Sequence, residues 1–192
     1  MRAFLLFSNK GYTAGKFGDL MKAGRLDIVV HSIIHCFFLS NRLRENVKMH
    51  IILNGPPDPP KHIEIVPNEN TPFSKKDFEK LLRIVLWKYK KDKKVEALPG
   101  IFIEKKSFEK VIEENYKKYK IFLLDRKGED IENINLNYEN IMFVLGDHEG
   151  LPKEKKKFVK KFCENIISLS NIEYFTSQCI VILNYILDKR QL

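Results

Sequence analysis

The sequence predicts an α/β fold built on a mostly parallel sheet flanked by helices. Short apolar segments alternate along the chain with longer segments whose apolar residues recur at helical spacing. This is the order of elements that a parallel sheet requires. No internal repeat appears, and no linker rich in proline or glycine divides the 192 residues into parts of different composition. A chain of this length can bury a substantial core, so we expect residues 1–192 to form a single domain.

The first part of the chain predicts a strand, a long loop, a helix and a second strand. Residues 2–7 are apolar and typical of a short buried strand, whereas residues 8–21 are rich in glycine and polar side chains and indicate a functional loop. Residues 26–39 are apolar almost all the way round and too long for an ordinary strand, which favours a buried helix. Residues 49–53 predict the next strand, and the four prolines in the loop 55–60 exclude a helix or a central strand there.

The middle of the chain predicts a strand followed by an amphipathic helix. Residues 62–66 have the pattern of a short strand, and Ser74 with Asp77 resembles a capping box that opens a helix. The apolar residues of that helix share one stripe at helical spacing: Phe78, Leu81, Leu82, Val85 and Leu86.

Two more strands and a second amphipathic helix are expected next. A break at Leu98-Pro-Gly precedes a strand at residues 101–103, and Ser107 is placed to cap the helix that follows. Residues 121–124 then return to the pattern of a buried strand.

A loop bracketed by glycines follows the strand predicted at residues 143–145. Gly146 and Gly150 permit a tightly bent loop, and Pro152 suits the first turn of a following helix. A further strand at residues 166–169 runs into a polar turn before the last helix. Open α/β sheets bind ligands at strand ends of this kind, so we expect the two strand ends to form one crevice.

The composition favours an anionic partner. The formal charge is +9, and lysines form runs at residues 88–94, 105–106, 117–118 and 153–161. Each run is interpretable as a solvated surface or as a surface that follows RNA phosphates. No apolar run is long enough for a membrane span and no secretory signal is recognisable, which favours a cytoplasmic location.

The three cysteines, Cys36, Cys163 and Cys179, are odd in number and widely spaced. This pattern predicts neither a disulfide framework nor a zinc site. Asp147, His148 and Glu149 are residue types that bind metals, but adjacent side chains point in different directions. We therefore expect His148 and Glu149 to shape their loop, and we predict no metal.

Three segments near the N-terminus carry a family resemblance: residues 24–27 (Gly-Arg-Leu-Asp), 36–40 (Cys-Phe-Phe-Leu-Ser) and the proline-rich loop 53–60. They resemble the archaeal tRNA pseudouridine N1-methyltransferase family called TrmY, which acts on position 54 of the T-loop. The passage from residue 143 to residue 187 is similar to the cofactor end of SPOUT-class RNA methyltransferases. The resemblance implies a SPOUT-type fold with a C-terminal trefoil knot, a homodimer, and the tRNA T-arm as partner.

The same resemblance implies S-adenosyl-L-methionine as the cofactor. The contacts it implies lie on three strand ends and the last helix: Leu123, Gly146, Leu169, Ser170, Asn171, Ile172, Glu173, Tyr174 and Cys179. Other interpretations stay open, because Gly146 is also a plausible turn glycine, Leu123 an ordinary strand residue and Cys179 a small core residue. Many SPOUT proteins have glycine where this chain has Ser170.

Arg25, Asp27 and Asp58 are the candidate catalytic residues. By the resemblance, Arg25 contacts RNA and Asp27 bonds to the base or accepts its proton, whereas a helix-start ion pair is the alternative. Asp58 lies in the stiff proline-rich loop, where it would face a flipped base or only complete a rigid turn. Two rival functions remain: a related ribosomal-RNA pseudouridine N1-methyltransferase, and an RNA-binding or ribosome-assembly module without catalysis.

Overall fold

The structure, a computed structural model, describes residues 1–73 and 77–191. Its strands are β1 (Arg2–Ser8), β2 (Val47–Leu53), β3 (Lys61–Ile65), β4 (Val95–Leu98), β5 (Ile101–Glu104), β6 (Lys120–Asp130), β7 (Ile141–Gly146) and β8 (Cys163–Ser168). Its α-helices are α1 (Leu26–Phe37), α2 (Phe78–Trp87), α3 (Phe108–Asn115), α4 (Lys153–Val159) and α5 (Thr176–Lys189), and a short 3-10 helix covers Ile131–Asn133. Helices alternate along the chain with single strands or with pairs of successive strands.

The eight strands join in one mixed sheet with the order β4-β5-β3-β2-β1-β7-β6-β8. Strands β2, β1, β7, β6 and β8 are parallel to their neighbours in this order. By contrast, β3 is antiparallel to β2, β5 to β3, and β4 to β5. The prediction of a mostly parallel sheet therefore holds for these five strands, which form the parallel half of the sheet. It is wrong for β3, β5 and β4, which form the antiparallel half. The links 54–60 and 99–100 are too short for the crossover that a parallel pair needs.

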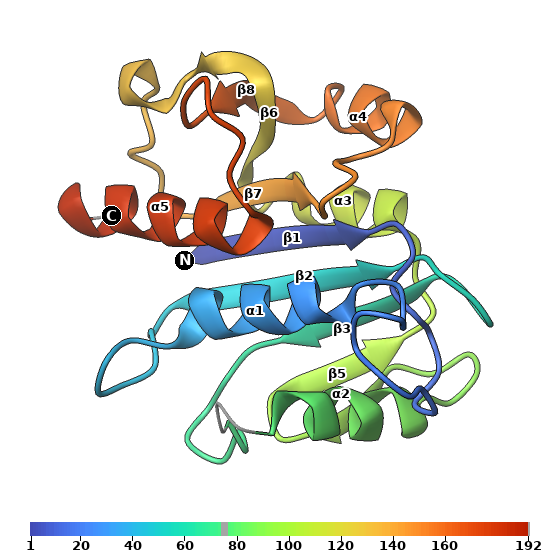
Figure 1. The fold of residues 1–192 in the computed structure, drawn as a ribbon. Helices are drawn as coiled ribbons and strands as arrows, with labels where there is room; N and C mark the ends of the chain where they lie inside the picture. Colours follow the sequence, from blue (N-terminus) through green and yellow to red (C-terminus); the bar gives the residue numbers. More distant parts are fainter. Residues whose placement is uncertain (74–76, 192) are drawn as a thin grey trace.

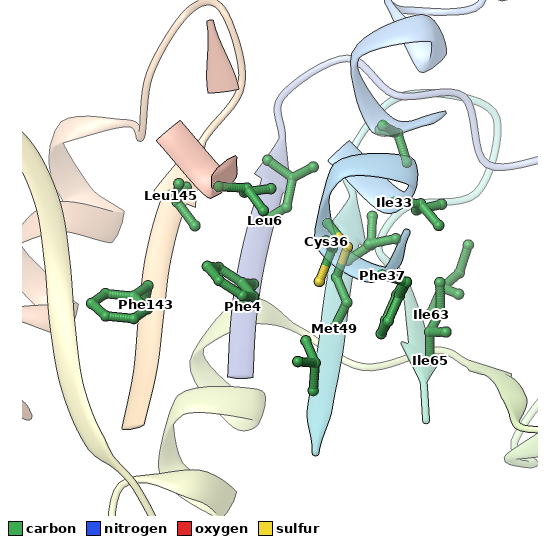
Figure 2. Packing of buried hydrophobic residues seen from close by; sticks show 14 of the residues in the cluster. Phe4, Leu6, Ile33, Cys36, Phe37, Met49, Ile63, Ile65, Phe143 and Leu145 are labelled. Carbon is green, nitrogen blue, oxygen red and sulfur yellow. The ribbon is translucent and has the colours of Figure 1, made fainter. Parts of the chain in front are cut away.

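Helices cover both faces of the parallel half, while only one face of the antiparallel half carries helices (Figure 1). On one face α1, α2 and α5 pack over a core that includes Phe4, Leu6 and Met49, and Figure 2 shows Phe4 beside Phe143 and Met49 beside Cys36 and Phe37 of α1. On the other face α3 and α4 pack over Leu5 and Val144. Because successive residues of a strand point to opposite faces, β1 is buried on both sides, which explains its continuous apolar run.

Several predicted details can be compared with the structure. The buried helix predicted at residues 26–39 is α1, and Ser107 caps α3 by accepting a hydrogen bond from the Lys110 amide at 3.2 Å. The proposed capping role of Ser74 lies outside the described residues; α2 begins after Asp77, whose side chain makes no capping bond. Strand β4 was not expected from the sequence.

The last helix crosses back over the sheet. Strand β8 is at the outer edge, yet α5 packs beside α1, and the segment between them passes in front of β6 and β7 (Figure 1). Within the described residues, no helix has the length and apolarity needed to cross a membrane. All three cysteines are free thiols.

Candidate functional site

The segments that follow the five parallel strands all lie at the same end of the sheet, where the strands have their carboxyl ends. Because β2, β1, β7, β6 and β8 run in the same direction, their carboxyl ends lie side by side. The segments that follow them therefore meet there, and these segments include the candidate residues on the loops after β1, β2, β7 and β8. Open α/β sheets bind ligands at the carboxyl ends of their strands.

Asp147 fastens the loop after β1 to the loop after β7. Its buried carboxylate accepts hydrogen bonds from the Asn9 amide at 2.7 Å, from Asn9 Nδ2 at 2.8 Å and from the Glu149 amide at 3.0 Å. Asn9 Nδ2 also donates to the Gly150 carbonyl at 2.9 Å, and Lys10 forms an ion pair with Glu149. The residues Asp147 and Glu149 thus shape the loop. Asn9 was not predicted as a site residue, although its place directly after a strand was a signal.

Gly146 has no room for a side chain. A Cβ at this position would lie 2.2 Å from the Gly150 carbonyl carbon and 2.3 Å from the Leu151 amide nitrogen. Gly150 itself has a φ of 72°, in the left-handed region that favours glycine. The loop after β7 therefore folds back onto the end of its own strand, which gives Gly146 a structural reason to be glycine apart from any contact with a cofactor.

The segment before α1 is built on close backbone contacts. Gly24 has a φ of 69°, and a Cβ there would lie 1.6 Å from the Lys10 carbonyl oxygen. A Cβ at Gly55 would lie 2.1 Å from the same oxygen. The loop after β1 is thus held between two glycines, one preceding α1 and one following β2. This packing fixes where Arg25 and Asp58 stand.

Arg25 and Asp27 form a two-pronged ion pair at the start of α1. Arg25, whose φ is 63°, donates from Nε to Asp27 Oδ1 and from Nη2 to Asp27 Oδ2, both at 3.0 Å. The hydrogen bond to Asp27 is the main reason that the pKa of Arg25 is raised, and the negative charge of Asp147 contributes. The Arg25 hydrogen bond in turn holds the pKa of Asp27 below its usual range. The pair is therefore ionised and within electrostatic reach of the loop after β7.

Asp58 is held by two lysines. It accepts from Lys61 Nζ at 2.5 Å and from Lys105, and the buried Lys61 ammonium also donates to the Asp58 carbonyl at 2.7 Å. These hydrogen bonds lower the pKa of Asp58 to about 2. A carboxylate of such low basicity is a weak proton acceptor near neutral pH. Its arrangement suits a group that orients a ligand or its loop.

The predicted cofactor residues after β8 form an exposed turn. Ser170 Oγ accepts from the Ile172 amide at 3.0 Å, and the Ser170 carbonyl accepts from Ser168 Oγ at 3.0 Å. Glu173 forms an ion pair with Arg126 at 2.8 Å, which links this turn to the segment after Leu124 in β6. Asn171, Ile172 and Tyr174 are exposed, whereas Leu169 is half-buried against the core.

Two other predicted contacts are buried. Leu123 is fully buried among the residues covered by α3 and α4, so only its backbone is available to a ligand at the strand ends. Cys179 is buried at the start of α5, and burial raises the pKa of its thiol to about 11. The thiol is therefore neutral at physiological pH and presents a small apolar surface.

The strand ends offer backbone groups and apolar side chains, which are the groups that an S-adenosylmethionine site needs. The ends of β6, β7 and β8 are adjacent, and Leu169 and Cys179 supply an apolar wall beside them. Thr176 Oγ1 donates to the Gly146 carbonyl at 3.0 Å, which places the start of α5 against the end of β7. Among the described residues, no cluster of three or more histidine, cysteine or acidic side chains is arranged to hold a metal ion.

Comparison with known proteins agrees with an RNA-modifying enzyme of this fold class. A family model described as "Putative SAM-dependent RNA methyltransferase" matches residues 1–192. The tRNA (pseudouridine(54)-N(1))-methyltransferase of Pyrococcus abyssi is 32% identical, with 98% of each chain covered. The enzyme of the same name from Methanococcus aeolicus is 36% identical, with 100% of each chain covered. The chain belongs to this family of S-adenosylmethionine-dependent RNA methyltransferases, and the predicted family resemblance is confirmed.

A solved structure shows the same fold. The crystal structure of Archaeoglobus fulgidus Nep1 bound to S-adenosylhomocysteine superposes with a TM-score of 0.68 at 13% identity, covering 100% of this chain and 98% of that one. The likeness covers the arrangement of strands and helices over the whole chain.

Proposed function

We propose that the protein transfers the methyl group of S-adenosylmethionine to N1 of pseudouridine at position 54 in the tRNA T-loop. The observation that carries this proposal is the full-length similarity to enzymes of that name, at 32% and 36% identity. Such a substrate implies a cytoplasmic location, as expected from the sequence. The excess of basic residues, 34 Lys and Arg against 25 Asp and Glu, suits an RNA partner.

The chemistry of pseudouridine defines what the site must do. Its base is joined to ribose through carbon, so N1 carries a proton and is available for methylation. The bound cofactor would supply a methyl group already activated on a sulfonium. The protein then has to hold N1 in line with that methyl group and let the proton leave, so positioning supplies much of the rate.

We assign positioning to the candidate catalytic residues. Arg25 would contact the RNA phosphate or base edge, oriented by its two-pronged bond to Asp27. Asp27 and Asp58 both have lowered pKa values, which favours a role as hydrogen-bond acceptors for the base or as anchors of their loops. Water is then the simplest final acceptor of the N1 proton.

We assign cofactor binding to the ends of β6, β7 and β8. Backbone groups near Leu123, Gly146 and the turn 169–174 would bind the adenosine part, and Cys179 would contribute apolar surface. The closeness of Gly146 to Gly150 supports a rigid loop, which is suited to presenting fixed backbone groups to a ligand.

We further propose that residues 1–192 form a single, knotted domain that assembles as a homodimer. The C-terminal trefoil knot is supported by the return of the chain from β8 at the sheet edge to α5 beside α1. Arg190 also donates to the carbonyls of Ile134 at 2.9 Å and Ile131 at 3.3 Å, in the loop that the knot would thread. Single-molecule stretching tests the knot: when the unfolded protein is pulled from its two ends, its end-to-end extension should remain smaller than that of an unknotted chain of 192 residues.

The decisive test of the function is nucleoside mass spectrometry. Purified protein and S-adenosylmethionine would be incubated with tRNA that carries pseudouridine at position 54, with the same tRNA carrying uridine there, and with ribosomal RNA that carries pseudouridine. N1-methylpseudouridine should form only in the first, because N1 of uridine is occupied by the glycosidic bond. Product in ribosomal RNA but not in tRNA would contradict the proposed substrate, and no product in either would contradict the proposed reaction.

A further inference from the structure

A cavity beside Asp58 is separate from the predicted cofactor crevice. It has a volume of about 290 Å³ and is lined by residues 13–16, Pro57, Asp58, Lys61, Leu86, Trp87 and Tyr89. It adjoins α2 and is lined from the loops after β1 and β2, whereas the residues proposed to bind the cofactor lie at the ends of β6, β7 and β8. Its size is near the lower end for pockets that hold small organic ligands.

The indole of Trp87 is held at this cavity but not covered. The side chain is 72% exposed at the last residue of α2. Gly15 packs so closely against it that a Cβ there would lie 2.0 Å from Trp87 Cδ1. Arg83 fixes the same loop by donating to the carbonyls of Phe17 and Gly18, and its guanidinium lies 4.0 Å above the Phe17 ring. A large apolar ring is therefore kept in position with most of its surface in solvent, which is unusual for a side chain that serves only the core.

Tyr89 adds an unsatisfied polar group to the cavity lining. Its ring lies against the buried Lys61 ammonium, 3.7 Å from nitrogen to ring centroid. Its hydroxyl is buried, and no hydrogen-bond partner for it is found among the described residues. Buried polar groups are normally paired, so this hydroxyl is available to a ligand that enters the cavity.

The basic run 88–94 begins at the cavity. It contains five lysines and one aspartate and connects α2 to β4. Lys90, Lys91 and Lys93 are exposed, and within the described part of the chain none of them forms an ion pair. Unpaired ammonium groups next to an exposed aromatic ring are the combination with which proteins bind single-stranded nucleic acid, since the ring stacks on a base and the lysines attract the phosphates.

We propose that this cavity binds one unpaired nucleotide of the RNA substrate, with its base stacked on Trp87 and its phosphates near the lysines of residues 88–94. The nucleotide is distinct from the one that is methylated, and Asp58, which lines the cavity, serves here as an anchor of its loop, because the cavity adjoins α2 and β3 while the proposed cofactor residues lie at the ends of β6, β7 and β8. The inference rests on the proposed function for the identity of its ligand. It gives the enzyme a second point of attachment, which would fix the orientation of the RNA relative to the cofactor.

The only tryptophan of the chain is Trp87, so its fluorescence reports on this cavity alone. A T-arm stem-loop RNA carrying pseudouridine would be titrated into the full-length protein without methyl donor. The emission should be quenched to saturation, with the same midpoint as fluorescence anisotropy of a labelled RNA. Inorganic polyphosphate should cause little quenching, because it carries charge but no base. Equal quenching by both, or none by RNA that binds, would overturn the stacking.

Variants test the contribution to affinity. Trp87→Ala should weaken RNA binding by about fivefold or more, since stacking one base is worth about 1–3 kcal/mol. Trp87→Phe should recover most of the affinity, and Tyr116→Ala, which removes a partly exposed aromatic ring on the α3 side, should bind as the wild type does. S-adenosylmethionine affinity should be equal in all three. Unchanged RNA affinity in Trp87→Ala would refute the site.

The methylation assay separates this inference from the proposed function. Methyl transfer without quenching of Trp87 fluorescence would support the proposed function and contradict the nucleotide site. Quenching without methyl transfer to any RNA would support the site and contradict the reaction. Absence of both would contradict both.

Discussion

At the scale of single residues, Asp147 connects parts of the site that are 138 positions apart in the sequence. From the sequence, a loop-shaping role was expected of its neighbours His148 and Glu149, but the residue that joins the two loops is Asp147, and its partner Asn9 lies near the N-terminus. No local pattern encodes that pairing, because it depends on β1 and β7 becoming neighbours in the sheet. The loop could be predicted to matter, whereas the contacts of Asp147 could not.

Arg25 gives the clearest prediction at this scale. Arg25→Ala should lower methyl transfer to tRNA by at least about tenfold, the equivalent of about 1.4 kcal/mol of transition-state binding. Affinity for S-adenosylmethionine should stay within about twofold, because the Arg25 side chain bonds to Asp27 on α1 and to no residue of the turn after β8. Single-turnover kinetics and calorimetry measure the two quantities separately.

Arg126→Ala is the matched control for Arg25. It also removes an arginine from an ion pair, here with Glu173 in the turn after β8. This substitution should lower the affinity for S-adenosylmethionine more than it lowers the rate of methyl transfer at saturating cofactor. Equal losses of catalysis and cofactor affinity in a folded Arg25→Ala protein would contradict the division of labour.

At the scale of elements, strands with a continuous apolar pattern were predicted well. Strands β1, β2 and β7 are buried on both faces, so nearly every residue is apolar and the pattern is clear. Strand β4 lies at the sheet edge, is four residues long and follows a lysine-rich segment, so its pattern was too weak to indicate a strand. The antiparallel direction of β3 was also missed, although the link 54–60 is too short for a crossover and was a signal.

The end of strand β7 should not tolerate a larger residue. Gly146→Ala should destabilise the fold by about 1–3 kcal/mol, since the new methyl group would overlap the backbone of Gly150 and Leu151. It should also weaken S-adenosylmethionine binding, because the loop after β7 would have to move. Urea unfolding and calorimetry measure the two effects. The control is Gly18→Ala, where a Cβ meets nothing within 4 Å, and a loss as large in that variant would disprove the steric explanation.

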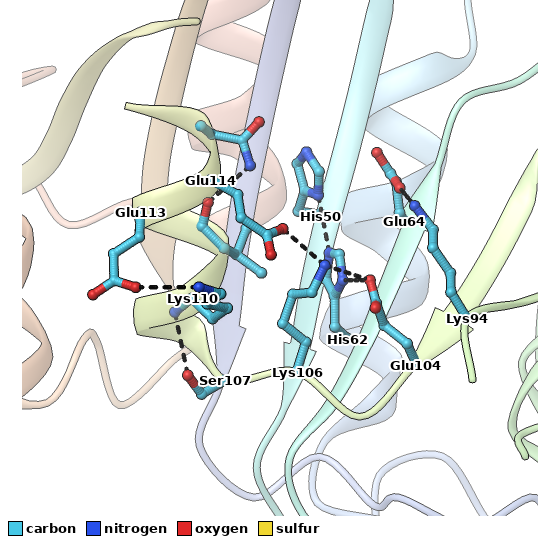
Figure 3. A network of polar contacts seen from close by, with 12 residues as sticks. His50, His62, Glu64, Lys94, Glu104, Lys106, Ser107, Lys110, Glu113 and Glu114 are labelled. Atoms are coloured by element: carbon cyan, nitrogen blue, oxygen red, sulfur yellow. Dashed lines mark hydrogen bonds and ion pairs between the residues drawn. The ribbon is translucent and has the colours of Figure 1, made fainter. Parts of the chain in front are cut away.

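A buried histidine pair links β2, β3 and β5 beside α3 (Figure 3). His50 Nδ1 lies 2.9 Å from His62 Nε2, and His62 Nδ1 lies 3.1 Å from Glu104 Oε1. The ionised Glu104 can only accept, so His62 Nδ1 donates to it and His62 Nε2 accepts from His50 Nδ1. This arrangement leaves His50 Nε2 as a bare acceptor, and that atom is buried without a partner among the described residues.

The histidine pair predicts a loss of stability in mild acid. Burial lowers the pKa of His50 to about 3, so the unfolded state binds more protons than the folded state once the pH falls below about 6.5. Stability is therefore fully present above that pH and decreases as the pH falls. The loss from His50 between pH 7 and pH 5 should be about 2 kcal/mol.

His50→Leu should remove that part of the pH dependence, whatever its effect on stability at pH 7. His31→Ala, which removes an exposed histidine of α1, should keep the dependence of the wild type. The free energy of unfolding measured in urea at pH 7, 6 and 5 gives the comparison. Parallel curves for wild type and His50→Leu would show that His50 does not carry the effect.

At the scale of the whole molecule, the apolar surface is concentrated on the last helix and the turn before it. Val181 and Tyr185 on α5 are exposed, together with Ile172, Tyr174 and Phe175, of which Phe175 is 76% exposed. The opposite side of α5 packs beside α1 in the core. Helix α5 is thus apolar over more than one face, and one of these faces has no partner within the described chain.

This surface is the expected interface of the proposed homodimer. A two-fold interface brings the same patch from each copy together, so one substitution acts twice. Tyr185→Lys should weaken the dimer by two orders of magnitude or more, because an unpaired charge buried at an interface costs about 3–5 kcal/mol. Sedimentation velocity over a range of concentrations measures the change, and Tyr116→Lys, on the α3 side, should remain dimeric.

The cofactor site should weaken together with the dimer. Ile172 and Tyr174 belong both to the apolar surface and to the turn proposed to bind S-adenosylmethionine, so a partner subunit that covers this surface also restrains the turn. Monomeric Tyr185→Lys protein should therefore bind the cofactor less tightly than the wild type does, although Tyr185 itself lies nearly three turns further along α5. A wild-type protein that is monomeric at every concentration would refute the interface, and a monomeric variant with unchanged cofactor affinity would show that each subunit completes its own site.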